Sequence, residues 1–174
     1  MSNKIVAGAL AAITLLSCAG ASRADDSKKP FAVRLGLYLP TDSTAREVSS
    51  VGANIGLSFF VNAKSSSQTL LSIDLDGTAV TSSGVSVGYG SIGITGRHFS
   101  KPGQGSGPYF GGGLGIYTSS VTLDGYGSVD NGAKLGAKLL AGTMSRNGSF
   151  AEAAYNYTST DLTGGLTITY GFRF

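Results

Sequence analysis

Cysteine, histidine and tryptophan are almost missing from this 174-residue chain, and each scarcity narrows what the protein can do. The sequence holds one cysteine, Cys18, one histidine, His98, and no tryptophan. One cysteine cannot form an internal disulfide framework. So few thiol and imidazole groups also leave too few ligands for a dedicated zinc or copper site. We therefore expect neither a structural disulfide nor a metal or other cofactor.

Charge and long apolar segments are scarce as well. Charged side chains make up 13% of the sequence, and the formal net charge is only +3. Such a small excess of positive charge does not favour nucleic acid as a partner. After the first 24 residues, no apolar segment reaches the roughly 20 residues that a membrane-spanning helix needs.

The longest apolar run lies at the amino terminus, where it indicates a secretory signal peptide. Lys4 precedes an apolar segment at residues 5–16, and Ser22 and Ala24 place small side chains at the two key positions of a cleavage site. The apolar segment is too short to span a bilayer as a helix. We therefore predict a cleaved signal peptide at residues 1–24.

Cleavage at this point would define the remaining organisation of the chain. Residues 25–30 would form a short polar leader and residues 31–174 a single domain, whose formal net charge would fall to +1 because two basic residues leave with the signal peptide. An alternative remains for the processing step. Residues 15–18 loosely resemble a lipoprotein cleavage box, in which Cys18 would be lipidated.

Glycine is abundant, and the domain alternates between apolar and small or polar residues. The 27 glycines are about twice the usual share of roughly 7%. A period of two is the period of a strand with one apolar face. Clusters of turn-forming residues separate the alternating segments. The predicted strands are residues 31–39, 51–61, 71–76, 85–99, 110–116, 133–140, 151–157 and 166–174.

The strand at residues 85–99 breaks this alternation. Val85, Val87 and Tyr89 share one parity, whereas Ile92 and Ile94 share the other. One extra residue in a strand moves every following side chain to the opposite face. A β-bulge near residues 90–91 would therefore place all five apolar side chains on the same face, and we predict one there.

Eight strands joined by hairpins predict a closed barrel. The strands approach the 9–11 residues that a tilted strand needs to cross a bilayer. An even number of them closes without free edges. The predicted fold class is all-β, an eight-stranded antiparallel up-and-down transmembrane β-barrel. With both termini periplasmic, the loops that could bind a surface ligand would be residues 41–50, 76–84, 119–132 and 158–165.

The last strand carries the most specific motif. Leu166, Ile168, Tyr170, Phe172 and Phe174 alternate with small or polar residues, and the chain ends on an aromatic side chain. This strand resembles the terminal signal strand of bacterial outer-membrane β-barrels. The resemblance implies a location in the bacterial outer membrane, with outer-membrane lipid and the barrel-assembly machinery as partners. It also implies that the machinery reads Ile168, Tyr170, Phe172 and Phe174.

The composition of the two faces indicates which one lines the lumen. The apolar face, which includes Leu35, Ile55, Leu135 and Ile168, would contact lipid. The other face is mostly small residues with a few long charges, which suits the narrow interior of an eight-stranded barrel. A soluble barrel that buries the apolar face is the alternative, but its solvent-exposed face would carry more charged residues than the small and polar face of this chain does. We expect a lumen ion-pair network of Arg34, Asp74, Asp76, Arg97, Lys134, Lys138, Glu152 and Arg173.

Two details of this network can be predicted. Lys134 and Lys138 share a face of one strand, and Glu152 lies on the next strand, so we expect Glu152 to neutralise both lysines. Asp74 and Asp76 also share a face and could instead hold a hard cation. Ion pairing is the favoured interpretation of these two carboxylates.

A short histidine–serine motif suggests an enzymatic alternative. His98 and Ser100 resemble part of the motif of outer-membrane lipid A deacylases, in which the histidine is the base for a serine nucleophile. Lys101 replaces the asparagine of that motif, and Gly112 stands where its acidic partner would be. We therefore do not expect an enzyme. The favoured function is a structural or surface-interaction barrel with a filled lumen, and the alternative is a small pore or carrier for hydrophobic molecules.

Overall fold

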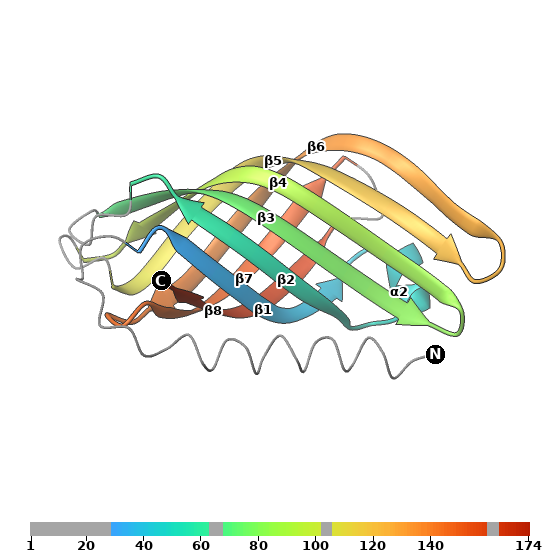
Figure 1. Cartoon of the computed structure of the whole chain (residues 1–174), viewed down its shortest axis with the longest axis horizontal. Helices are drawn as coiled ribbons and strands as arrows, with labels where there is room; N and C mark the ends of the chain where they lie inside the picture. Colours follow the sequence, from blue (N-terminus) through green and yellow to red (C-terminus); the bar gives the residue numbers. More distant parts are fainter. Residues whose placement is uncertain (1–28, 63–67, 102–105, 160–163) are drawn as a thin grey trace.

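Eight antiparallel strands close into a barrel in which each strand pairs with its neighbours along the chain and β8 pairs with β1 (Figure 1). The computed structural model describes residues 29–62, 68–101, 106–159 and 164–174. The predicted all-β, eight-stranded up-and-down barrel is confirmed. Its elements are β1 (Phe31–Pro40), α2 (Ser43–Val48), β2 (Gly52–Phe60), β3 (Thr69–Ser82), β4 (Val85–Phe99), β5 (Gly107–Leu123), β6 (Gly127–Met144), β7 (Ser149–Thr158) and β8 (Gly165–Arg173).

The signal peptide predicted at residues 1–24 and the lipidation alternative at Cys18 lie outside the described residues. Within the described ranges, no helix is long and apolar enough to cross a membrane.

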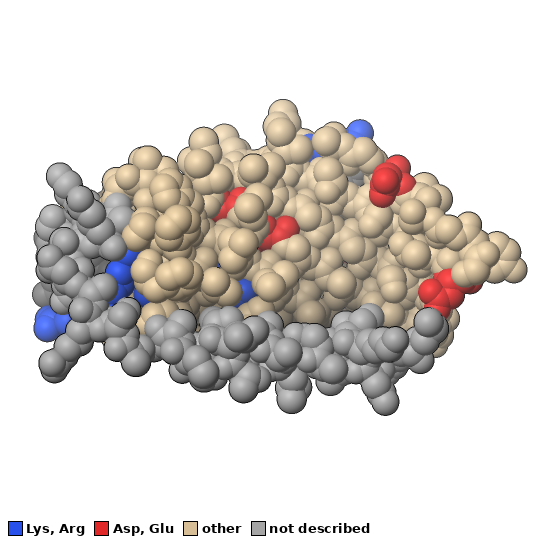
Figure 2. All heavy atoms as spheres, in the orientation of Figure 1, with Lys and Arg blue, Asp and Glu red and all other residues tan. Residues whose placement is uncertain are grey.

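The apolar face of the strands forms the outside of the barrel. Leu37, Ile55, Leu135 and Ile168 are each at least half exposed, whereas Leu35 is half-buried on the same outer face. The face shown in Figure 2 is correspondingly poor in charged side chains. Large aliphatic side chains over a whole outer wall are typical of a barrel that faces lipid and not of one that faces water.

The bulge predicted in β4 is absent, and that prediction was wrong. The pairing of β4 with both neighbours runs without interruption from Val85 to Phe99. Val87 and Tyr89 are buried in the lumen, whereas Ile92 and Ile94 are exposed on the outer wall. The parity of the apolar residues changes because the lumen beside Tyr89 is itself apolar, so inward positions there also carry large side chains. The register shift in the pairing of β5 with β6 lies between Thr118 and Ser120.

Two of the predicted outer loops are strands. β3 continues through residues 76–82 and meets β4 in a turn at Ser83 and Gly84, which have φ angles of 45° and 84°. Positive φ at both central residues is typical of a tight hairpin turn. β5 and β6 likewise continue through most of residues 119–132. For residues 119–132 the prediction failed because the β5–β6 ribbon extends beyond the barrel wall, where both of its faces are exposed to solvent and apolar alternation is lost. Residues 76–82 still belong to the barrel wall, since Thr78 and Val80 are buried, but their mostly small and polar side chains conceal the alternation.

The remaining outer connections differ from each other. Residues 41–50 hold α2, whose first turn is capped by the Asp42 side chain, which accepts hydrogen bonds from the backbone N–H groups of Thr44 and Ala45. Residues 160–163 of the connection at 158–165 lie outside the described residues. The tips of the β3–β4 and β5–β6 hairpins and α2 lie at one end of the barrel, and the carboxyl terminus lies at the other (Figure 1).

Candidate functional site

Six charged side chains meet at the centre of the lumen, of which five are buried and one, Asp76, is half-buried. Three are cations and three are carboxylates, and they come from β1, β3, β4, β6 and β7. Strand alternation places each of them on the inner face, where residues two apart along a strand point the same way. We call this set the lumen network, and its members are Arg34, Lys138, Arg97, Asp74, Asp76 and Glu152.

Arg34 reaches three carboxylates from β1. Its Nη1 lies 3.3 Å from Asp74 Oδ2 and 3.2 Å from Glu152 Oε1. Its Nη2 donates to Asp76 Oδ1 at 2.8 Å. The guanidinium lies against Gly56, where a Cβ atom would come within 2.7 Å of Arg34 Nε. A larger residue at this position of β2 would therefore have to displace the Arg34 guanidinium and the Asp76 carboxylate.

Arg97 is the most enclosed cation, with no solvent-exposed surface. Its Nε donates to Glu152 Oε2 at 2.7 Å, and its Nη2 lies 3.1 Å from Asp74 Oδ2. Nη1 donates to Ser72 Oγ at 2.7 Å, and that hydroxyl donates to Asp74 Oδ1 at 2.8 Å. Arg97 thus joins the carboxylates of β3 and β7 across the lumen.

Lys138 completes the network from β6. Its Nζ lies 3.1 Å from Asp74 Oδ2 and 3.1 Å from Asp76 Oδ2. Each carboxylate is therefore shared by at least two cations, and the formal charges of the set cancel. Buried ions are tolerated only when they are paired and hydrogen-bonded in this way. The pairing of Asp74 and Asp76 with basic groups favours the ion-pair interpretation over a hard-cation site.

The structure corrects two predicted members of the network. Lys134 is exposed, because β6 extends beyond the end of β7, whose Thr158 pairs with Gly136. Arg173 is buried but lies apart from the carboxylates. It donates to the backbone carbonyl of Lys29, at 3.2 Å from Nε and 2.9 Å from Nη2, and its guanidinium carbon lies 4.4 Å from the centre of the Phe60 ring.

The predicted pairing of Glu152 with the lysines of β6 was also wrong. The register of β6 and β7 places Glu152 opposite Gly142 and Lys138 opposite Asn156. Glu152 instead reaches across the lumen to the two arginines and accepts a hydrogen bond from Tyr109 Oη at 3.0 Å. Adjacent strands do not decide the pairing here, because long side chains in a narrow barrel reach the opposite wall.

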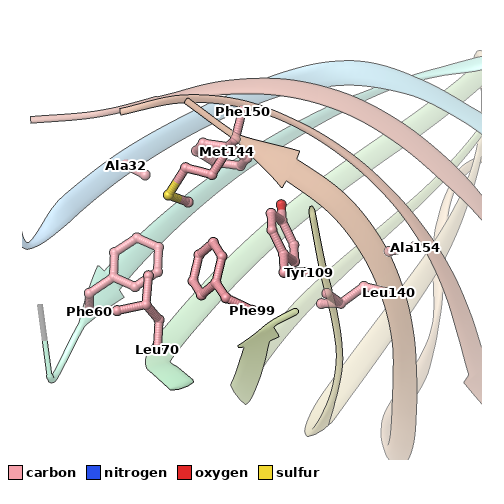
Figure 3. Close-up of a cluster of buried hydrophobic side chains, with 9 residues drawn as sticks. All are labelled: Ala32, Phe60, Leu70, Phe99, Tyr109, Leu140, Met144, Phe150 and Ala154. Atoms are coloured by element: carbon pink, nitrogen blue, oxygen red, sulfur yellow. The ribbon is translucent and has the colours of Figure 1, made fainter. Parts of the chain in front are cut away.

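Apolar clusters fill the lumen on both sides of the network. Towards the carboxyl-terminal end lies a cluster of Ala32, Phe60, Leu70, Phe99, Tyr109, Leu140, Met144, Phe150 and Ala154 (Figure 3). Towards α2 lies a second cluster of Tyr38, Val80, Tyr89 and Tyr117, in which the rings of Tyr38 and Tyr89 are 5.1 Å apart. Sequence reasoning missed both clusters, although inward aromatic residues such as Phe60 were visible in the alternation.

Little space is left inside this filling. Two cavities beside the network measure about 10 Å³ each. That volume is about the space one water molecule occupies in such a cavity. Among the described residues, no group of three or more His, Cys, Asp or Glu side chains is arranged to hold a metal ion.

The histidine of the enzymatic alternative is engaged elsewhere. His98 Nδ1 lies 3.0 Å from Thr69 Oγ1, and His98 Nε2 lies 3.3 Å from Gln68 Nε2. Its ring packs against Phe110 on the outer face, with the ring centres 5.4 Å apart. Both ring nitrogens therefore have partners other than Ser100, and this arrangement does not favour a histidine–serine pair.

The residues of the terminal motif form an outward stripe. Ile168, Tyr170 and Phe174 are at least half exposed on the outer wall, and Phe172 is half-buried there. Phe174 pairs through its backbone with Phe31, and the two rings stack with centres 6.3 Å apart. The motif thus lies at the seam where the first and last strands close the barrel.

Comparison with solved structures places this architecture among known proteins. No family model and no curated protein sequence matches the chain. The structure is similar to Neisserial surface protein A, with a TM-score of 0.57 and 18% identity over 83% of this chain and 95% of that one. This chain has the fold of the small outer-membrane β-barrels.

Two further barrels of this fold support the assignment. The N-terminal β-barrel domain of OprF from Pseudomonas aeruginosa gives a TM-score of 0.53 and 10% identity, covering 84% of this chain and 98% of that one. Ail, the attachment invasion locus protein of Yersinia pestis, gives a TM-score of 0.50 and 14% identity, covering 84% of this chain and all of that one. At such low identities the outer-membrane-barrel fold is what the proteins share.

Proposed function

We propose that this protein is a bacterial outer-membrane barrel with a structural or surface-interaction role, whose closed lumen makes the wall rigid and whose long hairpins face the outside. The filled lumen is the observation that carries this proposal. A neutral network of six charges lies between two apolar clusters, which is a packed core and not a path for solutes. Eight-stranded barrels have interiors that side chains just fill.

The outer end offers a surface for a partner. The β5–β6 hairpin extends past the end of β7 and exposes Tyr126 and Val129, which are 91% and 67% exposed. Exposed aromatic and aliphatic side chains on a projecting ribbon favour protein contact. Two proteins of similar fold are by name a surface protein and an attachment invasion locus protein, which supports the same role.

The route to the membrane forms part of the proposal. The signal peptide at residues 1–24 would direct export. The barrel-assembly machinery would then read the outward stripe of Ile168, Tyr170, Phe172 and Phe174 before outer-membrane lipid surrounds the apolar wall. The exposure of this stripe supports such recognition, because a receptor needs access to the side chains that it reads.

Surface display can be tested by labelling intact cells. In a Cys18→Ser background, Tyr126→Cys in the β5–β6 turn and Ser145→Cys at the opposite end each introduce one exposed thiol. A membrane-impermeant maleimide should label Tyr126→Cys on intact cells and Ser145→Cys only after lysis. Labelling of Ser145→Cys alone, or of both variants on intact cells, would contradict the proposed orientation.

The closed lumen can be tested by single-channel recording. We expect the wild-type barrel in a planar bilayer to show no steady conductance, because the lumen network and the two apolar clusters obstruct the bore. A wider outer-membrane porin, which keeps an aqueous channel, is the positive control in the same bilayers. A steady large conductance from the wild type would support the pore alternative instead.

A further inference from the structure

A hollow of about 850 Å³ lies along the outer wall of the barrel. It follows one row of cross-strand partners on the outer face and the neighbouring row beside it. The first row crosses six strands, and its successive members are Leu35, Ile55, Gly77, Gly90, Thr118 and Ala133. The lining of the hollow also includes four buried positions between the outward-facing residues, and these are Asn54, Thr78, Tyr89 and Ser119. We call this hollow the wall groove. Its volume is within the range of sites that bind small molecules.

Three glycines form the floor of the wall groove at positions where the barrel has room for a larger residue. A Cβ atom built on Gly77, Gly88 or Gly90 would meet its nearest neighbour at 3.6 Å, an ordinary contact distance. Glycine weakens a strand, and in a strand interior it often marks a bulge, a tight bend or the close approach of a ligand or another backbone. The pairing of β3 with β4 runs without a bulge at these positions. Gly115 of β5 has no such room, because a Cβ atom there would come within 2.6 Å of Ile92 O. The three groove glycines therefore leave room for something other than this chain.

The wall groove is continuous with the lipid-facing wall. A row of large, exposed aliphatic side chains follows it along one side, and these are Leu57, Leu75, Ile92, Ile116 and Leu135. A second barrel would present a convex wall, which does not enter a concave furrow. A flexible acyl chain can enter such a furrow, and acyl chains already surround a barrel that faces lipid.

The two ends of the wall groove differ in chemistry. At the β1–β2 end it is lined by Leu35, Ala53 and Ile55. At the β5–β6 end it is lined by Thr118, Ser120 and Asp130, on the part of the ribbon that extends beyond β7. Among the described lining residues there is no lysine or arginine, and the one charge is the Asp130 carboxylate. An apolar tail and a headgroup that donates hydrogen bonds match these two ends.

We propose that the wall groove binds one membrane lipid, with an acyl chain over the three glycines and an ammonium-bearing headgroup at Thr118, Ser120 and Asp130. An ammonium group donates hydrogen bonds to hydroxyl and carboxylate oxygens, and its charge complements Asp130. An anionic headgroup would instead meet the like charge of Asp130. The proposal depends on the lipid-facing wall and not on which end of the barrel faces the outside.

Native mass spectrometry of the full chain can test this binding. The barrel would be refolded into micelles that contain phosphatidylethanolamine and phosphatidylglycerol in equal amounts. We expect wild type to retain one phosphatidylethanolamine in preference to phosphatidylglycerol. Gly90→Leu fills the wall groove and should lower this retention roughly tenfold, since even one methylene group in an apolar pocket changes selectivity by that much.

Gly96→Leu is the matched control for the filled groove. Gly96 lies on the outer face of the same strand, outside the wall groove, and a Cβ atom there would meet Leu71 Cδ2 at 3.5 Å. This variant should retain lipid like wild type, and folding of each variant is checked by its heat-dependent migration on a gel. If Gly90→Leu does not fold, Ala79→Leu in the neighbouring row is the deciding variant and should show the same loss.

Asp130→Asn distinguishes the contribution of the lipid headgroup from that of the acyl chain. It should keep a bound lipid but lose the preference for phosphatidylethanolamine, because the carboxylate charge is gone. Equal retention by the groove-filled and control variants would overturn the proposal. Equal retention of the two lipids by wild type would overturn it as well.

Discussion

Replacing Glu152 with glutamine should lower the free energy of unfolding by about 3–5 kcal/mol, the usual cost of removing one partner from a buried ion pair. The Glu152 carboxylate pairs with Arg34 and Arg97 and accepts a hydrogen bond from Tyr109. Glutamine keeps the shape of the side chain but not its charge. Two buried guanidinium groups would then share the remaining carboxylates, in a place where water cannot solvate them. Urea unfolding in detergent micelles measures the loss.

Asp124→Asn provides the control for this measurement. Asp124 is exposed in the turn between β5 and β6, far from the lumen network, and it also changes from a carboxylate to an amide. Substitutions at such surface positions usually change stability by no more than about 0.5 kcal/mol. Equal losses in the two variants would show that the lumen network does not hold the barrel together.

Replacing Phe174 with serine should strongly reduce the amount of folded barrel in the outer membrane while leaving export intact. The Phe174 ring lies on the outer wall, half exposed, at the end of the stripe that resembles the assembly signal. Serine retains the backbone, and with it the two hydrogen bonds to Phe31 that close β1 against the carboxyl terminus. The change therefore removes the aromatic side chain but leaves the backbone pairing between the first and last strands in place. The heat-dependent gel shift in membrane fractions measures the folded amount.

Stability in vitro distinguishes assembly from folding in this experiment. The Phe174 ring makes one stacked contact, with Phe31, so the purified Phe174→Ser barrel should lose no more than about 1.5 kcal/mol. Tyr126→Ser, which removes an aromatic side chain from the β5–β6 turn, should assemble at wild-type levels. Normal membrane levels of Phe174→Ser would refute the role of the terminal residue, and a collapse of its stability in vitro would assign the effect to folding.

The period of two was sufficient to predict the fold. Alternation along each strand decides which residues share a face, so the outward positions of Ile55, Leu135 and Ile168 and the inward positions of Arg34, Lys138 and Glu152 followed from the sequence. The number of strands and the turn residues between them then led to a closed antiparallel barrel. These features are local, because they depend on neighbours along the chain.

Alternation failed where the environment of a face changes along a strand. In β4 the inner face passes from the buried apolar residues Val87 and Tyr89 to the lumen network at Arg97, while the outer face carries Ile92 and Ile94. Apolar residues then occupy both faces, and the pattern resembles a bulge. Beyond the barrel wall, in the β5–β6 ribbon, water reaches both faces and the pattern disappears.

Only the closed barrel decided which residues meet. The sequence by itself determined that Arg34, Asp74 and Glu152 point inward, but their strands are the first, third and seventh, and they touch because closure brings opposite walls within reach of a side chain. The wall groove arises in the same way, since its floor combines positions from Leu35 to Ala133 that share only a cross-strand row. Such contacts depend on register and curvature, which are properties of the whole sheet and not of any one strand.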